Sequence, residues 1–240
     1  MSDERPSRSA ATRQLPLALR YPPDQRMETY IAAPEGSIAQ LRELARPAGG
    51  AIYLQGAEGV GKTHLALATC AAAEASGGRA TYLPLQAARG RLSQALQALE
   101  GSALAAFDGL DAIAGDRADE VALFDFHNRA RSAGVALLYT ARLAPDQLPL
   151  VLPDLRSRLS QCARLVLDPL DDAGRREVLR ERAHRRGLVI DDAAYDWLLR
   201  RVGRDLAGLT SLLDRLDRAS LAAKRRITVP FLRELLDPAR

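Results

Sequence analysis

Short apolar runs alternate with amphipathic stretches up to about residue 168. The apolar runs have the length of strands. They are Ala51–Gln55, Ala80–Pro84, Ala103–Phe107, Val135–Thr140 and Ala163–Leu167. Apolar residues recur at helical spacing in Ser37–Arg46, Thr63–Ala75, Arg91–Leu99 and Ala118–Ser132. Strands and helices that alternate in this way form right-handed βαβ units, so the pattern predicts an α/β fold with a parallel sheet.

The pattern changes beyond Pro169, where we expect amphipathic helices with no strand between them. They are Asp171–Arg186, Asp191–Arg201, Asp205–Ala223 and Val229–Leu236. The first three begin with Asp, which is favoured at a helix N-cap or in the first turn, and Thr228 precedes the fourth as an N-cap. The chain is therefore expected to contain a disordered tail at 1–22, an α/β domain at 23–168 and a small all-helical domain at 169–240.

Composition places the chain among ordinary globular proteins. It has 240 residues, of which 47% are apolar and 27% charged, and no apolar run approaches the roughly 20 residues that a membrane helix needs. The polar N-terminus lacks the apolar segment of a signal peptide, and Cys70 and Cys162 fit no metal-binding spacing. We expect a cytoplasmic protein with free thiols and no membrane partner.

The basic excess is small and confined to one part of the chain. Residues 1–170 carry 18 basic and 18 acidic side chains, whereas residues 171–240 carry 16 and 12, which gives the net charge of +4. This surplus can add to nucleic-acid affinity but does not establish it. Of the 34 basic residues, only Lys62 and Lys224 are Lys, which indicates that an ammonium group is needed where one is kept.

The strongest motif is the segment from Gly56 to Thr63, GAEGVGKT, which fits G-x-x-x-x-G-K-[ST] at every fixed position. It follows an expected strand and opens an expected helix, as the motif requires. Its backbone N–H groups and the helix N-terminus would hold a β-phosphate, Lys62 would reach the β- and γ-phosphates, and Thr63 would ligate Mg²⁺. The alternative is a Gly-rich turn with a chance Lys. The residues assigned to a site for ATP or ADP with Mg²⁺ are Gly56, Gly59, Val60, Gly61, Lys62, Thr63 and His64.

Asp108 ends an apolar strand, which is the Walker B arrangement, and it would hold Mg²⁺ beside Thr63. The alternative is an Asp that caps the next helix. ATP-hydrolysing proteins of this type usually have a second carboxylate at the following position, where this chain has Gly109. Asp111 lies nearby but not at that spacing.

Three further features have two readings each. Arg158 suits an arginine finger that reaches the γ-phosphate of a neighbouring subunit, or it is a solvated surface residue. Arg204 opens a helix of the small domain and either touches the nucleotide from the lid side or lies on the helix surface. The tail pattern suits an extended peptide that docks in an apolar groove, or it packs on its own domain. That pattern consists of Gln14, Leu15, Leu17 and Leu19.

Taken together, the motifs resemble the AAA+ ATPases of the bacterial DnaA clade, and within it the regulators that inactivate the initiator. The resemblance covers nearly the whole chain. It is carried by Gly61–Leu65, Phe124–Arg129, Leu152–Leu159, Leu216–Ser220 and Ile227–Phe231. It implies an AAA+ nucleotide-binding domain at 23–168 followed by a helical lid at 169–240, with ADP as the nucleotide in the best-known cases.

The resemblance also implies partners and roles. The tail would bind the DNA polymerase III β sliding clamp, so that DNA is contacted mainly through the clamp. The chain would meet ATP-bound DnaA and stimulate hydrolysis of that ATP, with Arg158 as the finger in trans and Arg204 as the lid-side sensor. Arg156 has a weaker claim to the finger role. The oligomeric state stays open, with a nucleotide-dependent homodimer among the alternatives.

Two departures from the family pattern argue against self-catalysed hydrolysis but not against nucleotide binding. They are Gly109 and Arg142, the latter at a sensor position that is acidic in relatives. The alternative function is a DnaA-like, helicase-loader or transposition-helper ATPase that acts on DNA directly. The tail pattern, Gly109 and the expected lack of room for a helix-turn-helix module after the lid favour a regulator with weak or no ATPase activity of its own.

Overall fold

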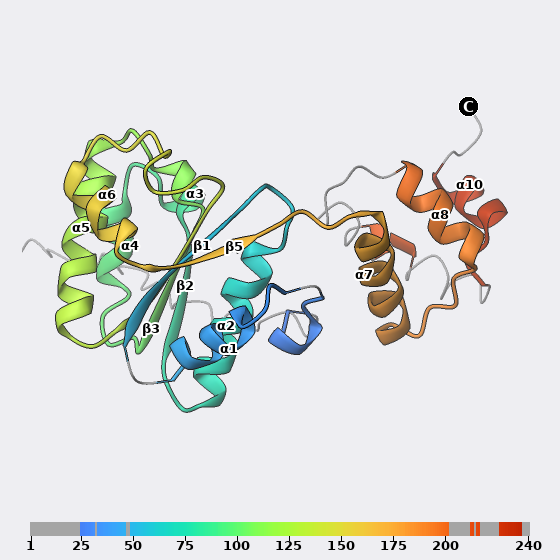
Figure 1. Ribbon diagram of the computed structural model, residues 1–240, viewed down its shortest axis with the longest axis horizontal. Coiled ribbons are helices and arrows are strands. Elements are labelled where there is room, and N and C mark those ends of the chain that lie inside the picture. Colours follow the sequence, from blue (N-terminus) through green and yellow to red (C-terminus); the bar gives the residue numbers. More distant parts are fainter. Residues whose placement is uncertain are drawn as a thin grey trace, which may run out of the picture.

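The computed structural model describes residues 25–31, 33–46, 49–201, 212–213, 215–216 and 226–236. Its sheet has five parallel strands in the order β2-β3-β4-β1-β5, and a group of helices follows the last strand (Figure 1). The strands are β1 (Gly50–Gly56), β2 (Ala80–Pro84), β3 (Leu104–Asp108), β4 (Ala136–Ala141) and β5 (Ala163–Leu167). The predicted α/β class with a parallel sheet and a helical lid is confirmed.

Helices cover both faces of the sheet, which is why the central strands are apolar throughout. One face packs against η1 (Met27–Thr29), α1 (Ser37–Leu44) and α2 (Lys62–Ala75). The other packs against α3 (Leu85–Ala88), α4 (Leu92–Gln97), η2 (Leu110–Ala112), α5 (Arg117–Ser132) and α6 (Pro153–Ser160). Successive side chains of β1 alternate between the two cores, with Ile52 and Leu54 in the first and Tyr53 in the second.

The short helix α6 was not among the expected elements. Pro153 occupies its first turn, where a missing backbone N–H costs nothing, and Leu155 and Leu159 are buried against the second core. The eight residues of α6 show only one apolar repeat, too short to stand out in the sequence beside its polar positions. This helix carries Arg158, so its placement determines where that side chain lies.

The lid contains α7 (Asp172–Arg185), α8 (Asp192–Arg201) and α10 (Val229–Leu236). Two of the predicted caps are confirmed, because Asp171 accepts a hydrogen bond from the N–H of Gly174 at 2.7 Å and Thr228 accepts one from the N–H of Phe231 at 3.4 Å. Between the helices, the described part of the lid contains one isolated parallel bridge, Ile190 to Ile227. Most of the helix expected at Asp205–Ala223 lies outside the described residues.

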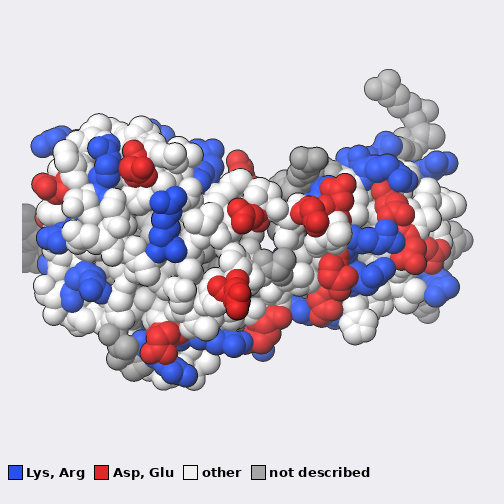
Figure 2. Space-filling view, viewed as in Figure 1, with Lys and Arg blue, Asp and Glu red and all other residues white. Residues whose placement is uncertain are grey.

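Charged side chains are dense on the lid surface, but many of them are paired (Figure 2). Asp192 accepts from Arg176 at 3.0 Å and from Arg180 at 3.2 Å, and Arg185 lies 2.7 Å from Glu181. Each such pair joins one basic and one acidic side chain, so the pairing leaves the small basic surplus of the lid unchanged. No helix in the described residues is long and apolar enough to cross a membrane.

Candidate nucleotide-binding site

The phosphate-binding motif lies at the carboxyl end of the central strand β1, between the end of β1 at Gly56 and the start of α2 at Lys62. Two glycines give the loop its shape, because Gly59 and Gly61 have φ values of +78° and +97° that other residues rarely adopt. Gly56 is required for close approach, since a Cβ there would lie 2.6 Å from the carbonyl oxygen of Leu167 at the end of β5. The local sequence therefore dictates a tight loop whose backbone amides are free to turn inward.

The side chain of Lys62 reaches back to the start of this loop. Its Nζ donates to the carbonyl oxygens of Gly56 and Ala57, both at 2.7 Å, and it forms no ion pair among the described residues. Burial lowers the pKa of Lys62, while the negative charges of Asp111 and Asp108 oppose that shift. A half-buried ammonium held only by carbonyl groups is suited to an anionic ligand, and the phosphates of a nucleotide fit this requirement.

Asp108, at the end of β3, accepts hydrogen bonds from three hydroxyl groups. Its Oδ2 accepts from Thr63 and from Tyr82, both at 2.7 Å, and its Oδ1 accepts from Thr140 at 2.5 Å. The structure thus brings together the two residues that the sequence assigned to Mg²⁺, Thr63 and Asp108. Tyr82 and Thr140 were not assigned to the site from the sequence, although they belong to β2 and β4, the two strands that flank β3.

A hydroxyl and a carboxylate oxygen are the ligand types that Mg²⁺ prefers. Among the described residues no group of three or more His, Cys, Asp or Glu side chains could hold a metal by itself. Mg²⁺ at Thr63 and Asp108 would therefore depend on phosphate oxygens and water for its remaining ligands, as Mg²⁺ in nucleotide sites does.

Gly109 and Arg142, the two positions that depart from the family pattern, contact Thr140 and Asp111 respectively. Gly109 has a φ of +84° and donates its N–H to Thr140 Oγ1 at 2.9 Å, so a carboxylate side chain at 109 would require a strained backbone. Asp111 Oδ2 accepts from the backbone N–H of Arg142 at 2.9 Å, and its Oδ1 lies 3.4 Å from Arg142 Nε. The carboxylate of Asp111 is therefore committed to Arg142 rather than available to activate water.

His64 lies beside the loop rather than in it. It belongs to the first turn of α2, is 6% exposed, and its Nε2 lies 2.8 Å from the carbonyl oxygen of Arg26. The ring therefore faces Arg26, in the segment that precedes α1. The tail residues Gln14, Leu15, Leu17 and Leu19, together with Arg204, lie outside the described residues.

Arg156 and Arg158 differ in what they contact. Arg156 is partly buried and donates from Nη2 to the carbonyl oxygen of Leu150 at 2.5 Å, inside its own loop. Arg158 is exposed, and its guanidinium has no hydrogen-bond or ion-pair partner within the described part of the chain. Helix α6 lies at the end of the sheet domain opposite to α7 (Figure 1). Of the two, Arg158 is the one placed to reach another molecule.

The start of α6 is fixed by Glu120 of α5, a fully buried carboxylate. It accepts from the N–H of Val151 at 2.9 Å and of Leu152 at 2.7 Å, and from the N–H of Gly115 at 2.8 Å. Leu152 is the N-cap residue of α6, so Glu120 sets where the helix begins. This role could not be predicted, because nothing in the sequence distinguishes Glu120 from a solvated acidic residue.

His127, which is close enough to Arg158 to be affected by its charge, is expected to make the free energy of unfolding depend on pH. Burial and the charges of Arg131 and Arg158 lower its pKa to about 4, and its Nδ1 lies 2.9 Å from the hydroxyl of Tyr139. The pKa of His is about 6.5 in the unfolded chain. Between pH 6.5 and pH 4 the unfolded state therefore binds a proton that the folded state does not bind. The free energy of unfolding should therefore fall as pH falls through this window.

Urea unfolding at pH 7 and pH 5 checks this expectation. His127→Gln keeps a hydrogen-bonding side chain but does not titrate, so it should lose less stability than the wild type between these two pH values. The matched control is His184→Gln, since His184 is exposed on α7. Equal losses in the wild type and His127→Gln would show that His127 is not responsible.

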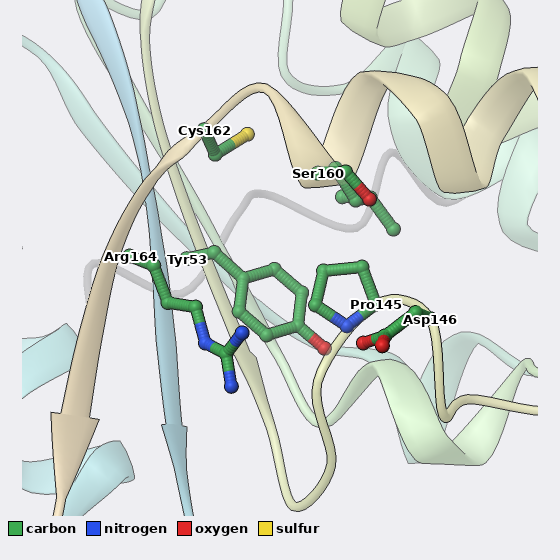
Figure 3. Close-up of a pocket in the computed structure, with 7 residues that line it drawn as sticks. Tyr53, Pro145, Asp146, Ser160, Cys162 and Arg164 are labelled. Atoms are coloured by element: carbon green, nitrogen blue, oxygen red, sulfur yellow. The ribbon is translucent and has the colours of Figure 1, made fainter.

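A separate hollow of about 200 Å³ lies between the end of α6 and the start of β5 (Figure 3). Two of its polar groups are already used within the fold, since Tyr53 donates to the carbonyl oxygen of Leu143 at 2.7 Å and Arg164 Nε donates to Gln55 Oε1 at 2.9 Å. It shares no residue with the phosphate-binding loop.

The sheet order, the loop sequence at the end of β1 and the helical lid after β5 define an AAA+ protein. Residues 172–236 match the family described as "Hda, lid domain". The fold is similar to that of domain III of the Thermotoga maritima replication initiation protein DnaA, with a TM-score of 0.76 and 18% identity over 91% of this chain and 98% of that one. The lid segment is thus similar to the Hda lid domain, and the chain has the fold of DnaA domain III.

Other solved structures share the fold over less of their own length. AMPPCP-bound DnaA from Aquifex aeolicus matches with a TM-score of 0.64 and 19% identity over 85% of this chain and 72% of that chain. The Thermotoga maritima RuvB Holliday junction branch migration motor matches with a TM-score of 0.61 and 19% identity over 91% and 72%. At these identities the likeness establishes the fold and leaves function to the site itself.

Proposed function

We propose that this protein is a negative regulator of replication initiation that binds ADP or ATP with Mg²⁺, docks on the DNA-loaded β sliding clamp and stimulates hydrolysis of the ATP bound to DnaA. Asp108 contacts the nucleotide from β3 and Arg204 contacts it from the lid side. The other residues that hold it belong to the loop and the first turn of α2, and they are Gly56, Gly59, Val60, Gly61, Lys62, Thr63 and His64. Residues Gln14, Leu15, Leu17 and Leu19 bind the clamp. Arg158 acts in trans on the nucleotide of the initiator.

The nucleotide part of the proposal is supported by the loop geometry and by Lys62. Glycines at the required positions, an ammonium that forms no ion pair among the described residues and the Thr63–Asp108 pair are the features that a Mg²⁺-nucleotide needs. The related fold of Aquifex aeolicus DnaA binds AMPPCP, an analogue of ATP.

The observation that carries the regulatory part is the contrast between the two candidate catalytic centres. Beside its own phosphate loop, the chain has Gly109 and an Asp111 that is held by Arg142. On helix α6 it presents Arg158, which is exposed and has no hydrogen-bond or ion-pair partner for its guanidinium in the part of the chain that the structure describes. A protein that hydrolyses its own nucleotide poorly but offers an arginine to a neighbour is suited to switch a partner ATPase rather than to run as one.

A single-turnover assay tests the proposal. DnaA loaded with ATP is mixed with this protein and with clamp loaded on DNA, and ADP formation is followed. Wild-type protein should accelerate hydrolysis only when the loaded clamp is present. Gln14→Ala should lower the rate about tenfold at limiting clamp, because truncating one of the few residues that dominate an interface costs more than about 1 kcal/mol. Raising the clamp concentration should restore the rate.

The matched control is Gln94→Ala, which truncates an exposed Gln on α4. It should behave as the wild type at every clamp concentration. If the wild type binds ADP but leaves DnaA hydrolysis unchanged with loaded clamp present, the regulatory proposal is wrong.

A further inference from the structure

The segment Arg26–Tyr30, which precedes the sheet domain, is fastened to the start of α2. Met27 is 4% exposed and packs in the same core as Leu65 of α2. Thr29 closes the turn, because its Oγ1 donates to the carbonyl oxygen of Arg26 at 2.8 Å and accepts from the N–H of Arg26 at 3.0 Å. The segment is therefore a fixed part of the domain from which a side chain can act with precision.

His64 adds a second fastening. Its Nε2 lies 2.8 Å from the Arg26 carbonyl oxygen, which can only accept, so Nε2 carries a proton and donates. The imidazole also meets the ring of Tyr30 edge to face, with centroids 5.5 Å apart and an angle of 68°. These contacts hold the Tyr30 ring over the phosphate-binding loop.

Tyr30 contacts two consecutive residues of that loop. Its hydroxyl donates to the carbonyl oxygen of Val60 at 2.7 Å. Its ring lies against Gly61, where a Cβ would come within 2.6 Å of Tyr30 Cε2. Gly61 is thus needed for two reasons, its positive φ and the approach of this ring. Burial raises the pKa of Tyr30 to about 12, so the hydroxyl keeps its proton at neutral pH and remains a donor.

The hydrogen bond to Val60 has a consequence for the next amide. In a planar trans peptide the C=O of one residue and the N–H of the next point in opposite directions. The Val60 carbonyl faces Tyr30, so the Gly61 N–H points away from Tyr30, which we infer to be the inner side of the loop. The inner side is where the motif's amides would meet the β-phosphate.

We propose that Tyr30 is a positioning residue of the phosphate site, whose hydroxyl locks the Val60–Gly61 peptide with its N–H directed at the β-phosphate. The inference rests on the proposed nucleotide binding and adds a residue that lies outside the loop motif. Tyr30 does not touch the nucleotide. It removes the cost of turning the peptide when a diphosphate binds, which is a gain from preorganisation.

Comparing nucleotides with different numbers of phosphates isolates this role. Tyr30→Phe keeps the ring on Gly61 and removes only the hydroxyl. Competition against a fluorescent ADP analogue should show ADP affinity reduced about fivefold to tenfold, as expected for one hydrogen bond. AMP lacks the β-phosphate, so its affinity should be unchanged. A variant that merely loosened the fold would weaken ADP and AMP together.

The control is Tyr195→Phe, which removes a hydroxyl from the core of the lid. It should leave the ratio of ADP to AMP affinity as in the wild type. The inference is overturned if Tyr30→Phe binds ADP as tightly as the wild type, or weakens ADP and AMP equally. Absence of ADP binding by the wild type would overturn the proposed nucleotide site and the role of Tyr30 with it.

Discussion

Arg158→Ala is expected to reduce stimulation of DnaA-bound ATP hydrolysis about 10³-fold or more while leaving ADP binding by this protein unchanged. An arginine finger places a guanidinium on the charge that develops at the γ-phosphate, and this is worth about 10³ to 10⁵ in rate. Arg158 is free to do this because its side chain is exposed and has no partner within the described part of the chain.

Arg158→Lys separates the contribution of charge from that of geometry. An ammonium keeps the positive charge but lacks the planar fork of donors, so this variant should recover only a small part of the rate. The matched control is Arg89→Ala, which removes an exposed Arg elsewhere on the domain and should retain full activity. Full stimulation by Arg158→Ala would assign the finger to another residue.

Arg156 is a poor substitute for that role. Its guanidinium already donates to the carbonyl oxygen of Leu150 within its own loop. Withdrawing it would leave that carbonyl without this donor and would disturb the loop that leads into α6. This contact is consistent with the weaker claim that the family resemblance implies for Arg156, whereas the sequence pattern alone leaves both arginines as surface residues or fingers.

The parallel sheet was predictable because each central strand is buried on both faces and reads as a continuous apolar run. Leu104–Asp108 and Ala136–Ala141 contain almost no polar residue before their last positions. The phosphate loop was predictable because its backbone conformation needs glycine at fixed positions, and Gly59 and Gly61 do adopt positive φ. Both signals are local, so they survive in a single sequence.

The residues that complete the site were not predictable because they come from other strands. Tyr82 and Thr140 meet Asp108 only after β2, β3 and β4 are placed side by side. The pairing of Asp111 with Arg142 similarly joins residues that are 31 positions apart. A sequence shows that these side chains are polar, but not which carboxylate each one reaches.

Tyr30 and Glu120 show the same limit for residues outside the site. Tyr30 lies in a segment without helical or strand periodicity, and Glu120 sits on an amphipathic helix where acidic residues are common. Their importance comes from the backbone groups that they contact, Val60 in one case and Val151 and Leu152 in the other. Backbone partners leave no trace in residue type, so only the structure reveals these contacts.

Glu120→Ala is expected to lower the free energy of unfolding by about 3–5 kcal/mol, a large share of the stability of a domain of this size. The substitution removes the acceptor of the N–H groups of Gly115, Val151 and Leu152, at a carboxylate whose own residue is fully buried. Each buried donor without a partner costs about 1–3 kcal/mol, and relaxation of the loop recovers part of the sum. Urea unfolding at neutral pH measures the change.

Two further variants make the result specific. Glu120→Gln keeps an amide oxygen that can accept some of these hydrogen bonds, so its loss should be clearly smaller than that of Glu120→Ala. Asp125→Ala changes an exposed carboxylate on the same helix and should leave stability within about 0.5 kcal/mol of the wild type. A loss below about 1 kcal/mol for Glu120→Ala would mean that the loop finds other acceptors. Because Glu120 fixes the N-cap of the helix that carries Arg158, Glu120→Gln should also stimulate DnaA less than the wild type under conditions where both are fully folded.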